Sequence, residues 1–364
     1  MAYSQNSLGV CMLERHSWTT RGGVDVRRVT EPVEGRAACD ALAAALDTRR
    51  GLIVVDDHGY ARSRAGRFYG YVDPPIEIVG RERELQVRAL NERGRVLLPA
   101  LSRAACPTLV DVRSSADALI GRVPAPDAEF CEEERTRQRT VHTVLRAILD
   151  CLAAPNDPDL GLYGMFGYDQ IFQFEPVEMR RRRDPGQRDL VLHLADRVIV
   201  SDGGSGTAVC KEYEFTVDHV DTEGLARTGP PAPWRRGAPP PRDRDHEPGQ
   251  YADLVRFARS WFEQGDLFEV VPSQSFYVPC DVSPAEISRR LRERNPAPYG
   301  LLANLGDGEF LVGASPEMFV RVDRERGADG AALRVRSSPI SGTAARGADP
   351  IEDANRIREL LNSA

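Results

Sequence analysis

Short apolar runs dominate the first half of the chain, and they predict a sheet-rich region. The runs at 52–55 and 190–200 contain Val, Ile and Leu and are bounded by Gly, Asp or Ser. Such runs are typical of buried strands. We interpret residues 84–89 and 96–101 as two further strands, joined by a hairpin turn at 91–94.

Helical patterns occur in fewer places in this half. Residues 37–48 are alanine-rich, and residues 132–152 carry apolar side chains three or four positions apart. Both patterns predict helices. Strands are therefore expected to outnumber helices before the middle of the chain.

A proline-rich stretch, residues 228–249, divides the chain. It reads TGPPAPWRRGAPPPRDRDHEPG, and its density of Pro, Gly and charge predicts an extended, semi-rigid linker. We therefore predict two domains, residues 1–227 and residues 250–364.

The region after the linker combines helices with an antiparallel meander. Helices are predicted by an apolar stripe over 251–262, a capping box at Ser283–Glu286 and a second N-cap at Asp349–Glu352. We interpret residues 267–278 as a strand. The meander is expected from the apolar runs at 301–305, 310–312, 318–322 and 332–335. The predicted fold class is α+β, with antiparallel β-sheets flanked by helices.

Composition narrows the classes of function. Apolar residues make up 41% and charged residues 28% of the chain, as in an ordinary globular protein. The net charge of −7, with acids interleaved among the arginines, argues against nucleic acid as the main partner. No apolar run is long enough to span a membrane, and the N-terminus lacks a signal-peptide pattern. We therefore expect a cytoplasmic protein.

Cysteine and lysine usage excludes several chemistries. The seven cysteines are dispersed without a C-x-x-C pair, which favours reduced thiols over disulfides or a zinc site. Lys211 is the only lysine. A mechanism that needs a lysine nucleophile or base must therefore use Lys211 or is excluded.

The candidate chemistry centres on two short motifs. Gly313–Glu317 (GASPE) and Pro339–Thr343 (PISGT) each follow a predicted strand. Small residues let the backbone approach a ligand closely, so we expect Glu317 and the Gly-Thr loop to line a pocket for a small polycarboxylate. Taken alone, a glutamate at such a position is more typical of an exposed surface carboxylate.

Four motifs in a fixed order resemble a known family. They are GDLFEVVPSQSF (265–276), NPAPYG (295–300), GASPE (313–317) and PISGTAARG (339–347). Their order and spacing are similar to those of the chorismate-utilising enzymes, most closely anthranilate synthase component I. Residues 349–364 further resemble the subgroup in which the synthase and a glutamine amidotransferase are fused in one chain. The resemblance implies the chorismate-utilising α+β fold, with a regulatory-type N-terminal domain before the catalytic domain.

The resemblance implies a lyase reaction in tryptophan biosynthesis. In the family, chorismate accepts ammonia, loses a hydroxyl group and then eliminates pyruvate to give anthranilate. Mg²⁺ holds a substrate carboxylate, and a glutamine amidotransferase domain or subunit supplies the ammonia. Complete members are expected to form homo-oligomers.

Catalytic and substrate-binding residues carry over by position from this resemblance. Glu317 matches the proton donor for the departing hydroxyl. Glu269 stands where relatives that add water carry lysine, and Ser341 stands where relatives that form a covalent adduct carry lysine. Both differences favour ammonia as the nucleophile. The matching substrate-binding positions are Ala314, Gly342 and Thr343.

Effector residues are expected at Pro298, Tyr299 and Gly300, which match a segment that binds tryptophan as a feedback inhibitor in the family. A turn that ends a helix is an equally good interpretation of these residues. Asp56 stands where relatives carry serine at the end of the partner strand. Feedback by tryptophan is therefore an open question, although Asp56 could accept a hydrogen bond from an amino group.

The resemblance places the family's magnesium-binding glutamates beyond Ala364, so no metal ligand is expected within this chain. We therefore expect an incomplete fragment without magnesium-dependent turnover of its own. Two alternatives stay open: an aminodeoxyisochorismate synthase of a secondary-metabolite pathway, and a non-catalytic remnant that binds an effector. Residues 249–364 expressed alone are expected to be poorly soluble, because apolar faces would be uncovered.

Overall fold

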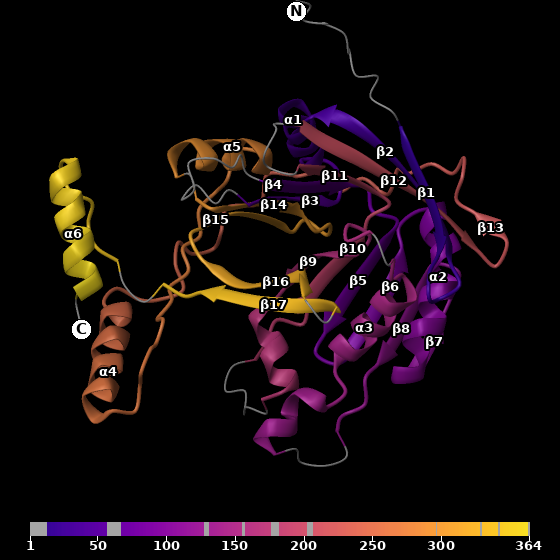
Figure 1. The fold of residues 1–364 in the computed structure, drawn as a ribbon. Coiled ribbons are helices and arrows are strands. Elements are labelled where there is room, and N and C mark those ends of the chain that lie inside the picture. Colours follow the sequence, from indigo (N-terminus) through magenta and orange to yellow (C-terminus); the bar gives the residue numbers. More distant parts are fainter. Residues whose placement is uncertain are drawn as a thin grey trace, which may run out of the picture.

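Two antiparallel β-sheets with helices packed on them form the body of the molecule (Figure 1). The computed structural model describes residues 13–56, 67–126, 131–154, 157–175, 182–201, 207–295, 297–327, 330–340 and 343–362. The helices are α1 (Gly35–Leu46), α2 (Glu92–Ala105), α3 (Val141–Cys151), α4 (Gln250–Gln264), α5 (Pro284–Arg294) and α6 (Pro350–Asn362). Short 3-10 helices are η1 (Cys106–Thr108), η2 (Glu132–Arg137) and η3 (Tyr168–Gln173).

The larger sheet joins strands from both sides of the proline-rich linker. Its strands are β1 (Glu14–Thr19), β2 (Asp25–Glu34), β3 (Gly51–Asp56), β4 (Arg67–Val72), β11 (Arg197–Ser201), β12 (Thr207–Val217), β13 (Val220–Asp221), β14 (Tyr299–Asn304) and β15 (Phe310–Ser315). They follow the order β1-β2-β12-β11-β4-β3-β14-β15, with β13 attached to β12. The sheet is therefore continuous from the first half of the chain into β14 and β15. The proposed division into two domains stays a prediction.

The smaller sheet is built from the first half of the chain alone. Its strands are β5 (Ile76–Arg81), β6 (Glu84–Ala89), β7 (Val110–Ser114), β8 (Ala118–Arg122), β9 (Leu162–Phe166) and β10 (Leu190–Leu194). They follow the order β7-β8-β6-β5-β10-β9. A separate hairpin consists of β16 (Met318–Gly327) and β17 (Gly330–Ser338).

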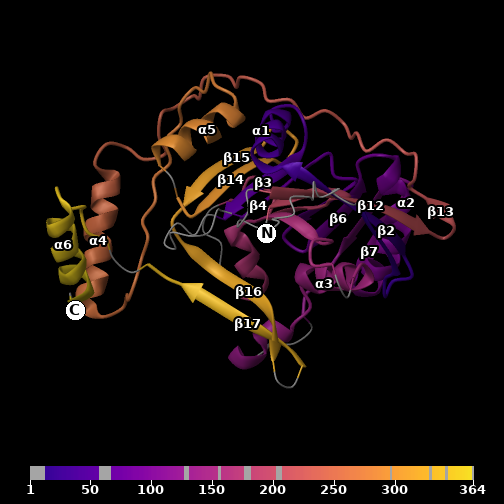
Figure 2. The same cartoon turned by 45° about the horizontal axis from the view of Figure 1, so that its top comes forward.

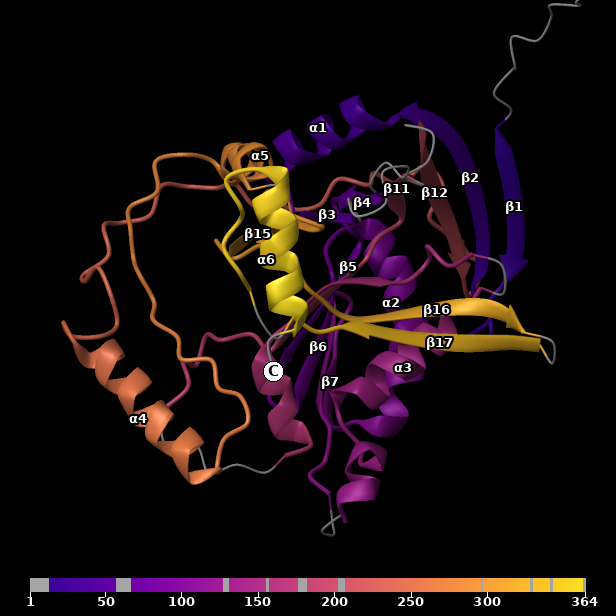
Figure 3. The same cartoon turned by 60° about the vertical axis from the view of Figure 1, so that its left-hand side comes forward.

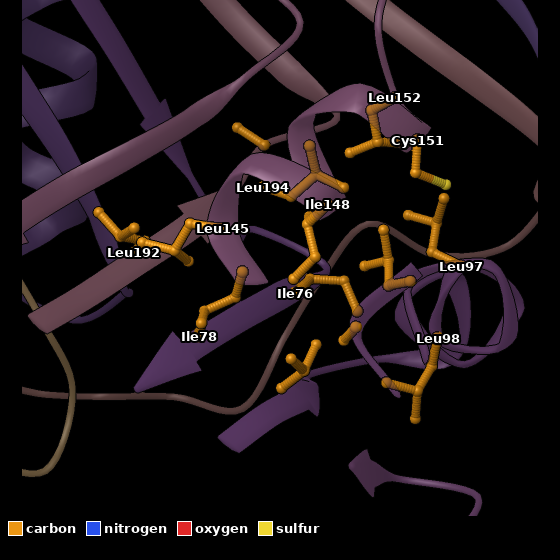
Figure 4. Close-up of a cluster of buried hydrophobic side chains, with 14 of the residues drawn as sticks. Ile76, Ile78, Leu97, Leu98, Leu145, Ile148, Cys151, Leu152, Leu192 and Leu194 are labelled. Carbon is orange, nitrogen blue, oxygen red and sulfur yellow. The ribbon is translucent and has the colours of Figure 1, made fainter. Parts of the chain in front are cut away.

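The main core lies between the smaller sheet and helices α2 and α3 (Figure 4). Buried side chains from β5, β10, α2 and α3 meet there: Ile76, Ile78, Leu97, Leu145, Ile148, Leu192 and Leu194. Each such side chain contributes about 1.5–3 kcal/mol on burial. A second cluster packs α1 on the larger sheet, where Leu42 and Leu46 meet Ile53 of β3 and Leu302 of β14.

The linker follows the predicted irregular course, and it is tied to the end of α1. The N–H groups of Ala232 and Trp234 donate to the carbonyls of Thr48 and Asp47 at 2.8 and 2.7 Å. In Figure 2 this segment runs past α1 and α5. An extended segment can satisfy its backbone groups in this way without forming a sheet.

Two interpretations of the first half are wrong. Residues 92–101 belong to α2, with Asn91 as its N-cap, rather than to a turn and a strand. Asn91 Oδ1 accepts the N–H of Gly94 at 3.0 Å, which caps the helix, and Leu97 and Leu101 are both buried. The run at 190–200 is two strands, β10 and β11, which lie in different sheets and are separated by the buried Asp196.

The predicted strand over 267–278 is also absent. The residues there are irregular, apart from a single bridge between Arg244 and Phe276. A strand needs a neighbour to satisfy its N–H and C=O groups, and no strand in the described ranges pairs with this segment. The four strands of the expected meander form two separate pairs, β14–β15 and β16–β17. In the described part of the chain, β15 does not pair with β16.

Apolar side chains are exposed on several elements after the linker. Phe268 is 99%, Phe319 88% and Leu361 80% exposed. Helices α4 and α6 stand away from the two sheets in Figures 1 and 2, and Figure 3 separates them from each other. No helix among the described residues is long and apolar enough to cross a membrane.

Candidate active site

The turn between β15 and β16 places Glu317 beside the loop that follows β17. Met318 of β16 faces Ser338 of β17 in the hairpin register. Glu317 precedes Met318, and its Oε1 accepts the N–H of Ile340 at 3.2 Å. The Glu317 N–H donates to Ser315 Oγ at 3.3 Å, which closes the turn. The expected neighbourhood of the GASPE and PISGT motifs is therefore confirmed at Glu317 and Ile340.

None of the described hydrogen bonds or ion pairs joins the other expected catalytic or substrate-binding residues to Glu317. Thr343 is exposed, and Ser341 and Gly342 lie outside the described residues. Glu269 is exposed in the irregular segment after α4, and none of the described contacts joins it to Glu317. Because Glu317 is itself exposed, this part of the site is an open pair of loops. The catalytic and substrate-binding roles stay predictions.

The described acidic, histidine and cysteine side chains do not gather into a metal site. Among the residues that the structure describes, no group of three or more His, Cys, Asp or Glu side chains could hold a metal ion. The partner of the Glu317 carboxylate is an N–H donor rather than a second carboxylate. The described residues therefore do not fit a Mg²⁺ ion.

The expected effector segment and its partner strand are direct neighbours. Strand β14 pairs with β3 in an antiparallel register that sets Tyr299 opposite Asp56 and Gly300 opposite Val55. Pro298, just before β14, is half-buried. Helix α5 ends at its C-cap Asn295, before this segment, and Tyr299 and Gly300 begin β14 rather than form the turn that the alternative interpretation expects. Tryptophan binding stays a prediction.

A hollow of about 140 Å³ lies between α1, α5 and the strands β3, β14 and β15. Gly300 and Ala314 are opposite each other in the β14–β15 register, and both line this hollow. A residue expected to bind substrate and one expected to bind effector therefore share one site. Arg292 and Cys39 form another wall, where Arg292 Nη1 donates to Cys39 Sγ at 3.8 Å. Burial raises the pKa of Cys39, so this thiol is neutral at pH 7.

Polar contacts at the end of α1 hold β14 and α5 in place. The fully buried Asn304 donates from Nδ2 to the carbonyls of Leu46 and Ala232 at 2.9 and 2.7 Å. Asp47 Oδ1 accepts the N–H of Ala285 in the first turn of α5 at 3.0 Å. Sequence reasoning missed these residues, because a single Asn or Asp after an apolar run gives no sign of a distant partner.

Two arginines from the first half hold the turn between β14 and β15. Arg188 donates to the Leu305 carbonyl at 3.0 Å and lies 3.5 Å from Asp307. Arg50 lies 3.4 Å from the same carboxylate. A Cβ atom at Gly306 would be 2.2 Å from Arg50 Nε, and the φ angle there is +72°. Glycine is therefore strongly favoured at this position.

Arg50 also reaches a buried charged cluster in the smaller sheet. Glu77 Oε1 lies 3.4 Å from Arg50 Nε and 3.6 Å from His193 Nε2, and Glu77 and His193 are fully buried. Burial alone would raise the pKa of Glu77, but His193, Arg88 and Arg50 lower it to about 2. Burial lowers the pKa of His193. The cluster links the core of the smaller sheet to the β14–β15 turn.

Comparisons with known proteins identify the same family as the GASPE and PISGT motifs. The chorismate binding enzyme family matches residues 109–364. An anthranilate synthase of Azospirillum brasilense is 45% identical over 358 residues, which cover 97% of this chain and 47% of that protein. A pyocyanine-specific anthranilate synthase component 1 of Pseudomonas aeruginosa is 32% identical over 283 residues, covering 73% and 51%. Anthranilate synthase component 1 of Serratia marcescens is 28% identical over 295 residues, covering 76% and 54%.

Three observations define the class of protein: the α+β fold, the GASPE and PISGT loops, and the match over most of the chain. The chain belongs to the chorismate-binding enzymes. The relatives described above are named anthranilate synthases, or component 1 of that enzyme. The chain spans about half the length of the curated relatives it matches.

Proposed function

We propose that this chain is part of an anthranilate synthase, which converts chorismate and ammonia to anthranilate and pyruvate in tryptophan biosynthesis. The support is the family membership, together with 45% identity to a relative named anthranilate synthase. The structural observation that carries the proposal is the hydrogen bond between Glu317 and Ile340, because it unites two motifs of the expected site.

Glu317 acts in this proposal as the general acid. The C4 hydroxyl of chorismate must leave as water, and a positioned carboxyl group supplies the proton. The Ile340 N–H orients that carboxyl and donates to the carboxylate that remains after proton transfer. Substrate binding must shield the exposed Glu317 from water for this step to be efficient.

The nucleophile in the proposal is ammonia rather than an enzyme amine. Lys211, the only lysine, lies on β12, where it forms ion pairs with Asp157 at 3.3 Å and with Asp159. Its amine is therefore committed to a buried cluster in the N-terminal half. Thr343, Gly342 and Ala314 bind the substrate in this proposal, and Glu269 lies near the entering ammonia.

The proposal includes several partners. A glutamine amidotransferase domain or subunit supplies ammonia, Mg²⁺ is required, tryptophan is a possible effector, and the complete cytoplasmic protein forms a homo-oligomer. The test is incubation of the gene product that carries this chain with chorismate, ammonium and Mg²⁺. Anthranilate and pyruvate in equal amounts support the proposal. Aminodeoxyisochorismate without pyruvate would instead support an enzyme of a secondary-metabolite pathway.

A second candidate function is effector binding without catalysis. The observation that favours it is the direct pairing of the Tyr299 segment with the strand that ends at Asp56. The same assay separates the two functions. Saturable tryptophan binding by a gene product that does not consume chorismate would support the effector-binding module.

A further inference from the structure

The hollow between α1 and α5 combines apolar walls with one positive charge. Ile53 and Val55 of β3 and Leu291 of α5 line it, and Ile53 is 4% exposed. Arg292 supplies a guanidinium group, and none of the described lining residues is acidic. Because the Cys39 thiol is neutral, the lining carries a charge of about +1. This favours an anion over a cation or a zwitterion.

Arg292 differs from its neighbours on the same helix. Arg289 forms ion pairs with Glu286 at 2.7 Å and with Glu293 at 2.6 Å, and Arg290 pairs with Glu286 at 2.6 Å. Arg292 forms no ion pair with a described carboxylate, and its contact inside the hollow is the Cys39 sulfur. Its remaining N–H donors are therefore available to a carboxylate ligand.

The volume limits the size of the ligand. The hollow measures about 140 Å³. A cavity of about 150 Å³ lined by aliphatic and aromatic side chains in another protein holds one benzene molecule. One six-membered ring therefore fits this space.

We propose that the hollow binds a small monocarboxylate with one apolar ring. The carboxylate pairs with Arg292, and the ring lies on Ile53 and Val55. Ala314 lines the hollow three positions before Glu317, so a bound ligand contacts the strand that leads to that residue. Anthranilate has this size and charge, and feedback by the product would follow only if the proposed function holds.

Benzoate tests the site without any assumption about catalysis. Isothermal titration of the full chain is expected to show one benzoate site, with the neutral isostere benzamide at least about tenfold weaker. Arg292→Gln should weaken benzoate at least about tenfold, because a charge-assisted pair is lost. Arg289→Gln, on the same helix but outside the hollow, should leave the affinity unchanged. Equal benzoate affinity in Arg292→Gln and the wild type, or no saturable binding at all, would overturn the proposal.

A second variant tests the ring rather than the charge. A Cβ atom at Gly300 would be 3.5 Å from Val55 Cβ, an ordinary contact, so Gly300→Val is expected to fold. The added methyl groups would occupy the hollow while Arg292 stays in place, and benzoate affinity should fall by at least about tenfold. Unchanged benzoate binding in a folded Gly300→Val protein would place the ligand outside the hollow and contradict the proposal.

Discussion

The carboxylate of Glu317 accepts the backbone N–H of Ile340 at 3.2 Å, across the open end of the β16–β17 hairpin. This contact exists because Met318 and Ser338 face each other in the register, which brings the residues before and after the hairpin together. The hairpin therefore converts two motifs that are distant in sequence into neighbouring loops. The stability of the hairpin and of the elements around it can be measured separately from catalysis.

Substitution of Gly306 is expected to loosen the β14–β15 turn. In Gly306→Ala, the new methyl group would collide with Arg50 Nε at a position whose φ angle is already +72°. Gly308 is the matched control, because its φ angle is +80° but nothing lies within 4 Å of the added Cβ. We expect Gly308→Ala to cost about 1 kcal/mol from backbone strain and Gly306→Ala distinctly more. Urea unfolding measures both, and equal losses would contradict the role of Arg50 in this turn.

Removal of Arg93 is expected to destabilise the first half of the chain strongly. Arg93 is 1% exposed, forms an ion pair with the buried Asp196 and donates to the Tyr213 carbonyl at 2.8 Å. Arg93→Met leaves the buried Asp196 carboxylate with Arg227, at 2.8 Å, as its remaining described ion-pair partner, and loss of one partner from a buried ion pair costs about 3–5 kcal/mol. Arg95→Met on the same helix removes only exposed ion pairs and should cost less than about 1 kcal/mol. A loss below about 1 kcal/mol in Arg93→Met would show that Asp196 is adequately compensated by its other neighbours.

Stability should fall as the pH drops below about 6.5. Burial lowers the pKa of His193, so the unfolded chain binds a proton in this range while the folded chain does not. Glu77, with a folded pKa of about 2, loses its contribution only at lower pH, as the pH falls below its ordinary value of 4.5. Between about pH 5 and 6.5, the change in stability therefore comes from histidines. Burial lowers the pKa of His142 as well, so His142 contributes to the same change.

Denaturation midpoints at pH 7.5 and pH 5.5 measure this dependence. His193→Gln should reduce the difference between the two midpoints and leave the remaining part to His142. If the wild-type midpoint is the same at both values, or if His193→Gln leaves the difference unchanged, His193 is not held neutral in the folded state.

The exposed hairpin should promote self-association. Phe319 of β16 is 88% and Leu333 of β17 is 68% exposed, and exposed apolar side chains favour aggregation. The double substitution Phe319→Thr and Leu333→Thr should lower the light scattering of concentrated solutions without a large loss of stability. Val220→Thr, at a 55% exposed position in the first half, is the control and should have no such effect. Equal scattering in all three proteins would show that another surface drives association.

Local pattern predicted most single elements of the fold correctly. The alanine-rich segment became α1, the capping box at Ser283 began α5, and the linker at 228–249 is irregular. These features depend on residues that are close in sequence, such as Ser283 Oγ accepting the N–H of Glu286 at 3.4 Å. Short-range chemistry of this kind can be read without knowing the tertiary structure.

The predictions were wrong where contacts with distant segments determine the secondary structure. Asn91 suits a hairpin turn or a helix N-cap, and the burial of Leu97 and Leu101 against the smaller sheet selects the helix. Residues 267–278 have strand composition but no described partner strand. The family resemblance, rather than a local pattern, named the strand that ends at Asp56 as the partner of the Tyr299 segment, and no local pattern indicates that Gly300 and Ala314 share a hollow.

The placement of Glu317 beside the PISGT loop was predictable, because Glu317 directly precedes β16 and the PISGT loop follows β17, its partner in the hairpin. The position of Glu269 relative to Glu317 was not, because it depends on how the irregular segment after α4 packs. The polar supports of β14 and β15, such as Asn304 and Arg188, could not be recognised in the sequence either. Each is recognisable only from its contacts with distant segments.

The most direct test of the proposed function is the rate of anthranilate formation in the gene product that carries this chain. With chorismate, ammonium and Mg²⁺, the wild type should release anthranilate and pyruvate in equal amounts. Glu317→Gln should lower kcat by about 10²–10⁴-fold, because the proton donor is lost. Glu263→Gln, an exposed position on α4, should retain the wild-type rate. Anthranilate formation at the wild-type rate in Glu317→Gln, or a wild type that never consumes chorismate, would contradict the account.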